Sequence, residues 1–243
     1  MSALLEVAGL QKRFGAIVVA DDVTFSLGSG HCLGMIGPNG AGKSSVFNLI
    51  AGTIPPDGGT IRFEGREIGR LPSHLRARLG IVRAFQIPQP FPHLTVYENV
   101  LAAASFGAGR SGASAATAAL DVLATMGLTA KAGMLAGRLP LLDRKRLELG
   151  KAVASAAKVL LLDEIAAGLT EPEVEELVAL VKNLKTSHAI IWIEHIPHAL
   201  RAVADRIMVL HFGRNVLEGP PAEVMTSRLV REIYMGFRAD DVA

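Results

Sequence analysis

The chain has 243 residues, a formal net charge of +2 and hydrophobic side chains at 50% of its positions, which suits one large domain or two small ones with a well-buried core. No apolar run reaches the roughly 18 residues of a membrane span. We expect no signal peptide, because the N-terminal residues lack a basic region followed by a long apolar stretch. One cysteine, Cys32, excludes an internal disulfide framework and fits a buried residue in a reducing compartment. The nearly balanced charge and low aromatic content argue against nucleic-acid binding.

The order of apolar patterns and breakers predicts an α/β protein. Strands and helices alternate before and after a proline-rich segment that begins near Ile87. In the first half the predicted elements are strands at 4–10 and 17–27, a turn at 28–30, a strand at 31–37, a helix at 45–52, a loop at 52–60, a strand and turn at 61–68, a helix at 73–80 with Ser73 as its N-cap, and a strand at 80–86.

The middle of the chain predicts a helical subdomain, residues 88–157, inserted into the α/β core. The segment IPQPFPHL, which starts at Ile87, contains three prolines and cannot form a helix or a central strand. Apolar positions at helical spacing follow, interrupted by a passage rich in Ala, Gly and Ser, where we expect a mobile loop at 107–114. The nucleotide-binding core is then expected to comprise residues 1–87 and 158–243.

From Lys158 onward the alternation of strands and helices resumes. The predicted elements are a strand at 158–164, a helix at 171–184, a strand at 188–195, a helix at 197–204, a hairpin at 205–220 and two short helical pieces after it. Thr170 and Glu173 have the spacing of a capping box, and Pro172 lies in the first helical turn.

Residues 37–44, GPNGAGKS, match the phosphate-binding pattern G-x-x-x-x-G-K-[ST] between a predicted strand and a predicted helix. We expect their backbone N–H groups and the helix dipole to hold the phosphates of a nucleotide. The residues of this loop are Gly37, Pro38, Asn39, Gly40, Ala41 and Gly42. Lys43 would neutralise the β- and γ-phosphate oxygens, Ser44 would place a hydroxyl on Mg²⁺, and Ser45 would bond another phosphate oxygen.

A second motif, VLLLDE at 159–164, supplies two carboxylates at the end of an apolar strand. Ligands of parallel sheets bind at the carboxyl ends of the strands. Asp163 would hold Mg²⁺ through water, and Glu164 would orient or deprotonate an attacking water. Alone, the motif also fits a strand that ends in two solvated acids; the phosphate-binding loop favours the catalytic interpretation.

Together these residues resemble the ATP-binding subunits of ABC transporters, and the resemblance covers nearly the whole chain as a single ABC ATPase domain, 1–243. Gln86, in RAFQ, matches the Q-loop glutamine, which approaches Mg²⁺ and the γ-phosphate. His195, in IIWIEH, matches the switch histidine that contacts the γ-phosphate, and Phe14 matches the aromatic residue that stacks on adenine. The resemblance implies an α/β P-loop NTPase core of the RecA-like kind, an N-terminal antiparallel β subdomain, an inserted α-helical subdomain, and ATP and Mg²⁺ as cofactors.

Within that family, FNLIAGTIPPDGGTIRFEGREI, LTVYENV, DEIAAGL and VREIYMG look like the ATPases of branched-chain amino-acid importers. The resemblance implies a second ATPase subunit, two integral membrane permeases at whose cytoplasmic face the chain would sit, and indirectly a solute-binding protein. The prolines after Gln86 would lie near the coupling helix of a permease. Importers of urea or amides have similar ATPases, so the solute stays open.

The signature of the family, usually LSGGQ, is replaced by LPLLD at 139–143. In the family this segment contacts the γ-phosphate of ATP held by the partner subunit. Pro140 has neither a hydroxyl nor an N–H, Leu142 adds a side chain where close approach is wanted, and Asp143 adds negative charge, although it could cap the helix. The D-loop aspartate is also missing, because GLTE stands at 168–171. A heterodimer with one degenerate site and a tolerated variant of the signature both stay open.

Four further interpretations are kept. Arg144, Lys145 and Arg146 are expected to form a solvated helix face, with assistance to a phosphate as the alternative. A subunit that binds ATP without turning it over competes with an ATPase. Soluble ABC ATPases of DNA repair or translation, and small-molecule kinases, fit less well, since long insertions are missing and about thirty residues precede the phosphate-binding loop.

Overall fold

A six-stranded sheet forms the centre of the computed structural model, which describes residues 3–235. Its strand order is β10–β9–β3–β8–β7–β6, parallel from β9 to β6, with β10 antiparallel at one edge. The strands of this sheet are β3 (Cys32–Ile36), β6 (Ile81–Ala84), β7 (Val159–Asp163), β8 (Ala189–Ile193), β9 (Arg206–His211) and β10 (Arg214–Gly219).

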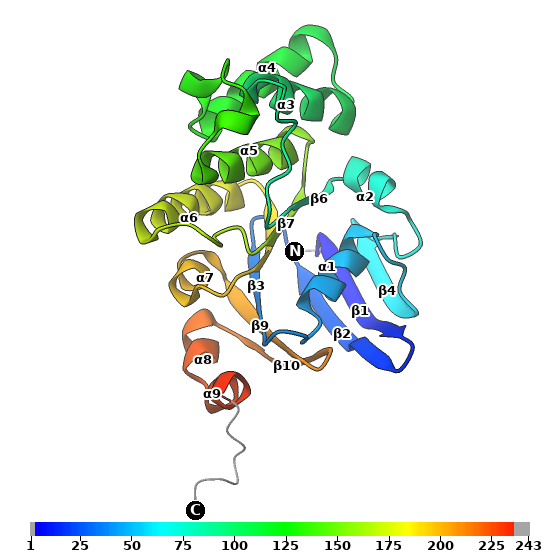
Figure 1. The fold of residues 1–243 in the computed structure, drawn as a ribbon. Helices are drawn as coiled ribbons and strands as arrows, with labels where there is room; N and C mark the ends of the chain where they lie inside the picture. The colour runs from blue at the N-terminus through cyan, green and yellow to red at the C-terminus, as the bar shows by residue number, and fades with distance from the viewer. Residues whose placement is uncertain (1–2, 236–243) are drawn as a thin grey trace, which may run out of the picture.

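A second, antiparallel sheet of four strands lies beside the first one, with helix α1 (Lys43–Ala51) close to it (Figure 1). Its order is β2–β1–β4–β5. The strands of this sheet are β1 (Leu5–Phe14), β2 (Ile17–Leu27), β4 (Gly58–Phe63) and β5 (Arg66–Glu67). The predicted N-terminal β structure is therefore confirmed, and it packs on the central sheet through a shared hydrophobic cluster that includes α1.

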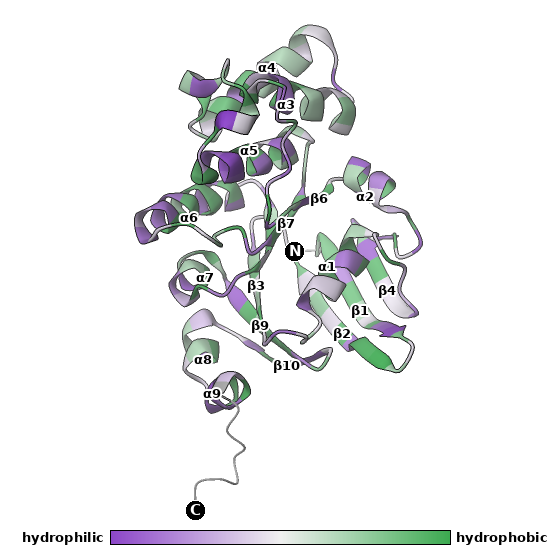
Figure 2. Ribbon diagram, viewed as in Figure 1, coloured by the Kyte–Doolittle hydropathy of each residue, from purple (hydrophilic) through white to green (hydrophobic). Residues whose placement is uncertain are grey.

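The remaining helices connect the strands or follow them. They are α2 (Ser73–Leu79), α3 (Val96–Ala102), α4 (Gly112–Thr125), α5 (Leu141–Ala154), α6 (Glu171–Lys185), α7 (Pro197–Val203), α8 (Pro221–Thr226) and α9 (Arg228–Met235). Three short helical turns of other types occur at Ala103–Gly107, Thr129–Lys131 and Ala136–Arg138. In Figure 2, α5 and α6 carry both hydrophilic and hydrophobic residues, as expected of amphipathic helices that cover a sheet.

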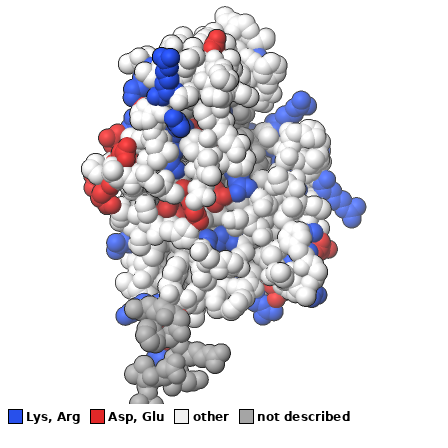
Figure 3. Space-filling view, viewed as in Figure 1, with Lys and Arg blue, Asp and Glu red and all other residues white. Residues whose placement is uncertain are grey.

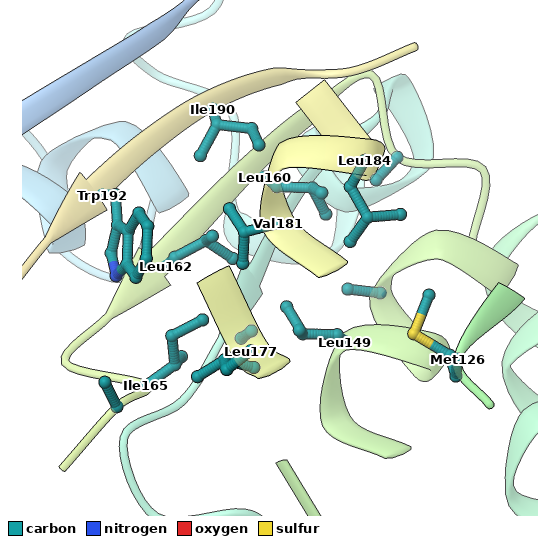
Figure 4. Close-up of a cluster of buried hydrophobic side chains, with 14 of the residues drawn as sticks. Met126, Leu149, Leu160, Leu162, Ile165, Leu177, Val181, Leu184, Ile190 and Trp192 are labelled. Atoms are coloured by element: carbon teal, nitrogen blue, oxygen red, sulfur yellow. The ribbon is translucent and has the colours of Figure 1, made fainter. Parts of the chain in front are cut away.

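Successive residues of the central strands point to opposite faces of the sheet, and both faces are covered. On β7, Val159 and Leu161 join the cluster with α1, whereas Leu160 and Leu162 join a second cluster on the opposite face. Figure 4 shows this second cluster, in which side chains of α6 and α5 meet those of β7 and β8. Its labelled members are Met126, Leu149, Leu160, Leu162, Ile165, Leu177, Val181, Leu184, Ile190 and Trp192.

The sequence predicted most elements within a few residues, and two details differ. Pro72, not Ser73, is the N-cap residue of α2, because helical geometry begins at Ser73. The expected loop at 107–114 is shorter, since helical turns reach Gly107 and α4 begins at Gly112. The capping box of Thr170 and Glu173 is present. Among the described residues, 3–235, the helices are all too short or too polar to span a bilayer.

The only cysteine of the chain, Cys32, gives a test of this packing. It lies on β3 with a fully buried side chain, and burial raises the pKa of its thiol to about 12. The thiol is therefore neutral and shielded at pH 8, and only unfolding would expose a reactive thiolate.

We expect iodoacetamide at pH 8 to leave Cys32 unmodified in native buffer and to label it fully in denaturant, with the labelled fraction following the unfolding transition measured by circular dichroism. Mass spectrometry gives the labelled fraction, and a Cys32→Ala variant provides the blank. Rapid labelling of the native chain would contradict the buried position of β3.

Candidate functional site

The glycine-rich loop leaves β3 after Ile36 and enters α1 at Lys43. Two of its glycines are required by close backbone approaches. A Cβ atom on Gly37 would lie 2.2 Å from the carbonyl oxygen of Leu210, and one on Gly42, which has a φ of 103°, would lie 2.3 Å from that of Val19. Strands β9 and β2 thus hold the loop from two sides and fix its shape.

Lys43 opens α1, and its ammonium group folds back over the loop. The Nζ atom donates hydrogen bonds to the carbonyl oxygens of Gly37 at 2.6 Å and of Pro38 at 3.1 Å. Burial lowers the pKa of Lys43, and the nearby carboxylates of Glu164 and Asp163 act in the opposite direction. The first turn of α1 contains no acidic residue, so no carboxylate there offsets the positive end of its dipole.

Asp163 ends β7 and is held by an arginine that the sequence analysis did not single out. Arg83, on the neighbouring strand β6, pairs with the Asp163 carboxylate through one terminal nitrogen and donates to Asn48 Oδ1 on α1 at 2.6 Å through the other. This guanidinium therefore joins β6, β7 and α1 directly below the loop. A charged residue within the otherwise apolar strand IVRA was the signal that could have revealed it.

Glu164 follows in a left-handed backbone conformation, with a φ of 47°, which is uncommon for a residue other than glycine. Its N–H donates to the carbonyl oxygen of Ile193 on β8 at 2.9 Å. Its carboxylate accepts a hydrogen bond from Gln86 Nε2 at 2.8 Å through Oε2, and Oε1 lies 2.6 Å from His195 Nε2. The structure therefore brings together three residues that the sequence placed far apart.

The other predicted binding residues, Phe14, Ser44 and Ser45, are at least partly exposed. The ring of Phe14, at the end of β1, is 51% exposed, and Lys12 Nζ lies 5.3 Å from its centroid. Ser44 is exposed and Ser45 is half-buried in the first turn of α1. Figure 3 shows acidic and basic side chains dispersed over the visible face, with no continuous basic band.

A divalent cation would find oxygen donors here but no complete cage. Within the described part of the chain, no group of three His, Cys, Asp or Glu side chains is placed to hold a metal. The Ser44 hydroxyl and the Asp163 carboxylate are the kind of donors that Mg²⁺ takes alongside water and phosphate oxygens. These residues therefore fit Mg²⁺ that arrives with a nucleotide.

In the segment LPLLD, the observed position of Asp143 differs from the predicted one. Helix α5 begins at Leu141 with Pro140 as its N-cap residue, so the expectation that Asp143 caps the helix is wrong. Asp143 lies in the first turn, is 3% exposed, and pairs with Lys131 and Arg146. Its charge is therefore compensated inside the chain. Among the described residues, the N–H groups of 141–143 have no hydrogen-bond acceptor.

The prediction that Arg144, Lys145 and Arg146 form a solvated face is also wrong for two of these three residues. Lys145 is 2% exposed. Arg146 is half-buried and pairs with Asp143 and with Glu176 of α6. Arg144 alone is exposed, and it donates to the carbonyl oxygen of Leu139 at 2.7 Å.

Two further polar residues reach the site without having been predicted. Glu194 is 2% exposed and accepts hydrogen bonds from the N–H groups of His195 at 2.8 Å and Ala166 at 3.1 Å; burial raises its pKa. Tyr234, on α9, accepts a hydrogen bond from the N–H of Gly37 at 2.8 Å through its hydroxyl. Only the folded chain reveals this contact, because the two residues are 197 positions apart.

Residues 20–167 match a family model described as "ABC transporter", which covers more than half of the chain. The chain belongs to this family. It is an ABC ATPase, and the α/β P-loop fold expected from its sequence is confirmed. Proteins of this family bind ATP or ADP.

Three relatives of this ABC ATPase extend the comparison. It is 36% identical to the high-affinity branched-chain amino acid transport ATP-binding protein BraF of Pseudomonas aeruginosa, over 96% of this chain and 98% of BraF. It is 31% identical to the lipopolysaccharide export system ATP-binding protein LptB of Acidithiobacillus ferridurans, over 97% and 98%. The crystal structure of the ADP conformation of the ATP-binding cassette MJ1267 superposes with a TM-score of 0.88 at 28% identity, over 98% of this chain and 100% of that one.

Because Asp143 points inward and pairs with two cationic side chains, its replacement is expected to destabilise the fold. We expect Asp143→Asn to lower the free energy of unfolding by about 1–3 kcal/mol, because it leaves Lys131 and Arg146 without their shared carboxylate, while both keep partial contact with water. Chemical denaturation gives the value. Asp121→Asn on the exposed side of α4 is the matched control and should change stability by less than about 0.5 kcal/mol. Equal stability of both variants would mean that Asp143 faces solvent.

Proposed function

We propose that this ABC ATPase is the ATP-hydrolysing, energy-coupling subunit of an importer for branched-chain or related amino acids. The observation that carries the proposal is the similarity to BraF along nearly the whole of both chains. It is associated with the cytoplasmic face of the cell membrane through its permeases. Since LptB belongs to an export system, the direction of transport and the solute rest on the closer resemblance to BraF.

In this proposal, the loop 37–42 holds the phosphates of ATP with its backbone N–H groups, and Phe14 stacks on the adenine. Lys43 moves from the carbonyl oxygens of Gly37 and Pro38 to the β- and γ-phosphate oxygens, and Ser45 donates to another phosphate oxygen. Ser44 and Asp163 would hold Mg²⁺, the latter through water, and Gln86 would approach the same ion. The ion neutralises charge that develops on the transferred phosphoryl group.

Glu164 is the proposed residue that positions the attacking water. Its carboxylate lies between the Gln86 amide and the His195 ring, so two side chains restrict its orientation. His195 would then contact the γ-phosphate while Glu164 accepts a proton from the water. The left-handed backbone at Glu164 turns the chain off the sheet edge, and such conformations are frequent at functional sites.

We expect Glu164→Gln to lower the steady-state rate of ATP hydrolysis by about 100-fold or more, because the amide cannot accept the proton of the water. Binding of a fluorescent ATP analogue should be retained, since the loop and Lys43 are unchanged. Phosphate release by the purified chain, with and without permeases, measures the rate. A variant that hydrolyses ATP as fast as the unmodified chain would remove Glu164 from the mechanism.

A second ATPase subunit, different from this chain, is part of the proposal. In the ABC arrangement each ATP lies between the P-loop of one subunit and the signature segment of the other. The segment LPLLD offers no hydroxyl, because Pro140 replaces the usual serine, and it retains the free N–H groups of 141–143 and the dipole of α5. A non-identical partner with a complete signature would close the site that contains Lys43 and Glu164. Turnover by the purified chain alone would instead favour a homodimer.

A groove between the core and the helical region is the proposed docking site of the permease. A cavity of about 560 Å³ lies beside the segment that follows Gln86. Its walls include the exposed rings of Phe85, Phe91 and Phe106, and its polar lining includes Glu148 and Lys151. An exposed aromatic cluster of this kind is typical of an interaction surface.

We expect Phe106→Ser to weaken co-purification of the chain with its permease from detergent-solubilised membranes by about tenfold, because this ring is 85% exposed at the groove and would be buried by the partner. Leu120→Ser, at an exposed position of α4 outside the groove, is the control. Equal recovery of the permease with both variants would exclude the groove.

The competing candidate, a subunit that binds ATP without turning it over, is favoured by the altered signature and opposed by the intact Gln86, Glu164 and His195 group. Loss of turnover in Glu164→Gln discriminates between them. The solute is tested separately, by uptake of radiolabelled leucine and of urea in cells with and without the gene. Uptake of urea alone that depends on the gene would replace the amino-acid assignment.

A further inference from the structure

Helix α5 is connected to the segment after β6 by three side chains on one face. Lys145, Glu148 and Lys151 are spaced three residues apart, so they project from neighbouring turns of the same side of the helix. All three contact the backbone of the segment 86–89. Neither the phosphate-binding loop nor the proposed chemistry accounts for these contacts.

The contact at the first end of this segment involves the residue whose side chain meets Glu164. Lys145 Nζ donates to the carbonyl oxygen of Gln86 at 3.1 Å, while the side chain of Gln86 donates to Glu164. Gln86 lies beyond the end of β6 at Ala84, so sheet hydrogen bonds do not fix its backbone. The direction of its amide therefore depends on contacts outside the sheet.

The contacts at the other end form a closed group. Glu148 Oε2 accepts the N–H of Gln89 at 3.1 Å, Lys151 Nζ donates to the carbonyl oxygen of Gln89 at 2.7 Å, and Lys151 pairs with Glu148 at 2.8 Å. Both backbone groups of Gln89 are thus bound by one face of α5. Glu148 and Lys151 also line the 560 Å³ cavity.

The free-energy cost of burying the Lys145 ammonium group indicates that this residue does more than fill space in the core. Lys145 is 2% exposed, and among the described residues its ammonium group bonds to the carbonyl oxygen of Gln86 and forms no ion pair. Burial lowers the pKa of Lys145, and the charge of Glu194 partly offsets this effect. An ammonium group removed from water without a directly paired acid is expensive, and an apolar side chain of similar length would fill the same space.

We propose that Lys145 is a positioning residue for ATP hydrolysis, which holds the Gln86 backbone so that the Gln86 amide meets Glu164. Together with Glu148 and Lys151, it makes α5 a rigid connection from the cavity and the signature segment to the Glu164 carboxylate. An occupant of the cavity would lie against Glu148 and Lys151, the two residues that bind Gln89. This inference rests on the proposed role of Glu164.

The test replaces Lys145 by Met, which keeps the length of the side chain and removes the donor. Turnover is measured in the assembly in which the unmodified chain hydrolyses ATP, alone or with its partner. We expect kcat to fall by about 10- to 100-fold, because a small displacement of an orienting group is costly. The KM for ATP and the affinity for a fluorescent ATP analogue should change by less than about twofold. Lys145→Arg, which keeps a charged donor, should restore most of the rate.

A matched control and a second observable separate positioning from general destabilisation. Lys182→Met makes the same chemical change at an exposed position of α6 and should leave turnover unchanged. Hydrogen–deuterium exchange of the peptide that contains Gln86 and Gln89 should accelerate in Lys145→Met and not in Lys182→Met, whether or not the preparation hydrolyses ATP. If Lys145→Met does not fold, Lys151→Met tests the Gln89 end with the same measurements.

Unchanged turnover and exchange in the Lys145 or Lys151 variant would overturn the inference. Parallel losses of melting temperature, ATP affinity and kcat that Lys145→Arg does not restore would overturn it as well, since they indicate a packing role. Failure of the proposed function is recognised independently, because Glu164→Gln would then keep its activity. Loss of turnover in Glu164→Gln with full activity in Lys145→Met would reject the positioning role alone.

Discussion

The burial of three parallel strands on both faces is the constraint on which the site depends. Every residue of β3, β7 and β8 is buried, so these strands cannot carry functional polar groups along their length. Polar side chains are confined to the points where the strands end. The phosphate-binding loop follows β3, Asp163 and Glu164 lie at the end of β7, and His195 follows β8. One edge of one sheet therefore gathers chemistry from segments that are more than a hundred residues apart in the chain.

Whether a feature could be predicted from the sequence depends on how far apart in the chain the interacting residues are. The glycine-rich loop, the buried strands and the capping box at Thr170 depend on neighbouring residues, and local patterns were sufficient for them. The pairing of Arg83 with Asp163 and the burial of Lys145 depend on elements brought together by the sheet and by α5. Charged residues on a helix are usually solvated, so the run from Arg144 to Arg146 was predicted to face solvent. In the folded chain, Lys145 contacts the segment after β6 and Arg146 contacts α6.

The altered signature segment has a physical interpretation that the motif alone did not provide. Its acid is turned inward and compensated by Lys131 and Arg146, so it stabilises the start of α5 instead of opposing a phosphate. A Cβ atom placed on Gly168, in the segment that replaces the usual D-loop, would lie 3.2 Å from a methyl carbon of Leu141. The two unusual segments of the chain therefore lie next to each other.

The hydrogen bond from Gly37 to Tyr234 has a consequence for how the protein is made. A ribosome completes the glycine-rich loop early and α9 late, since 197 residues separate the two partners. The first N–H of the loop consequently lacks this acceptor until Tyr234 has been synthesised. A nascent or truncated chain that lacks α9 could contain every nucleotide-binding motif and still lack the hydrogen bond from Gly37 to Tyr234. Folding of the nucleotide site is thereby linked to the synthesis of α9.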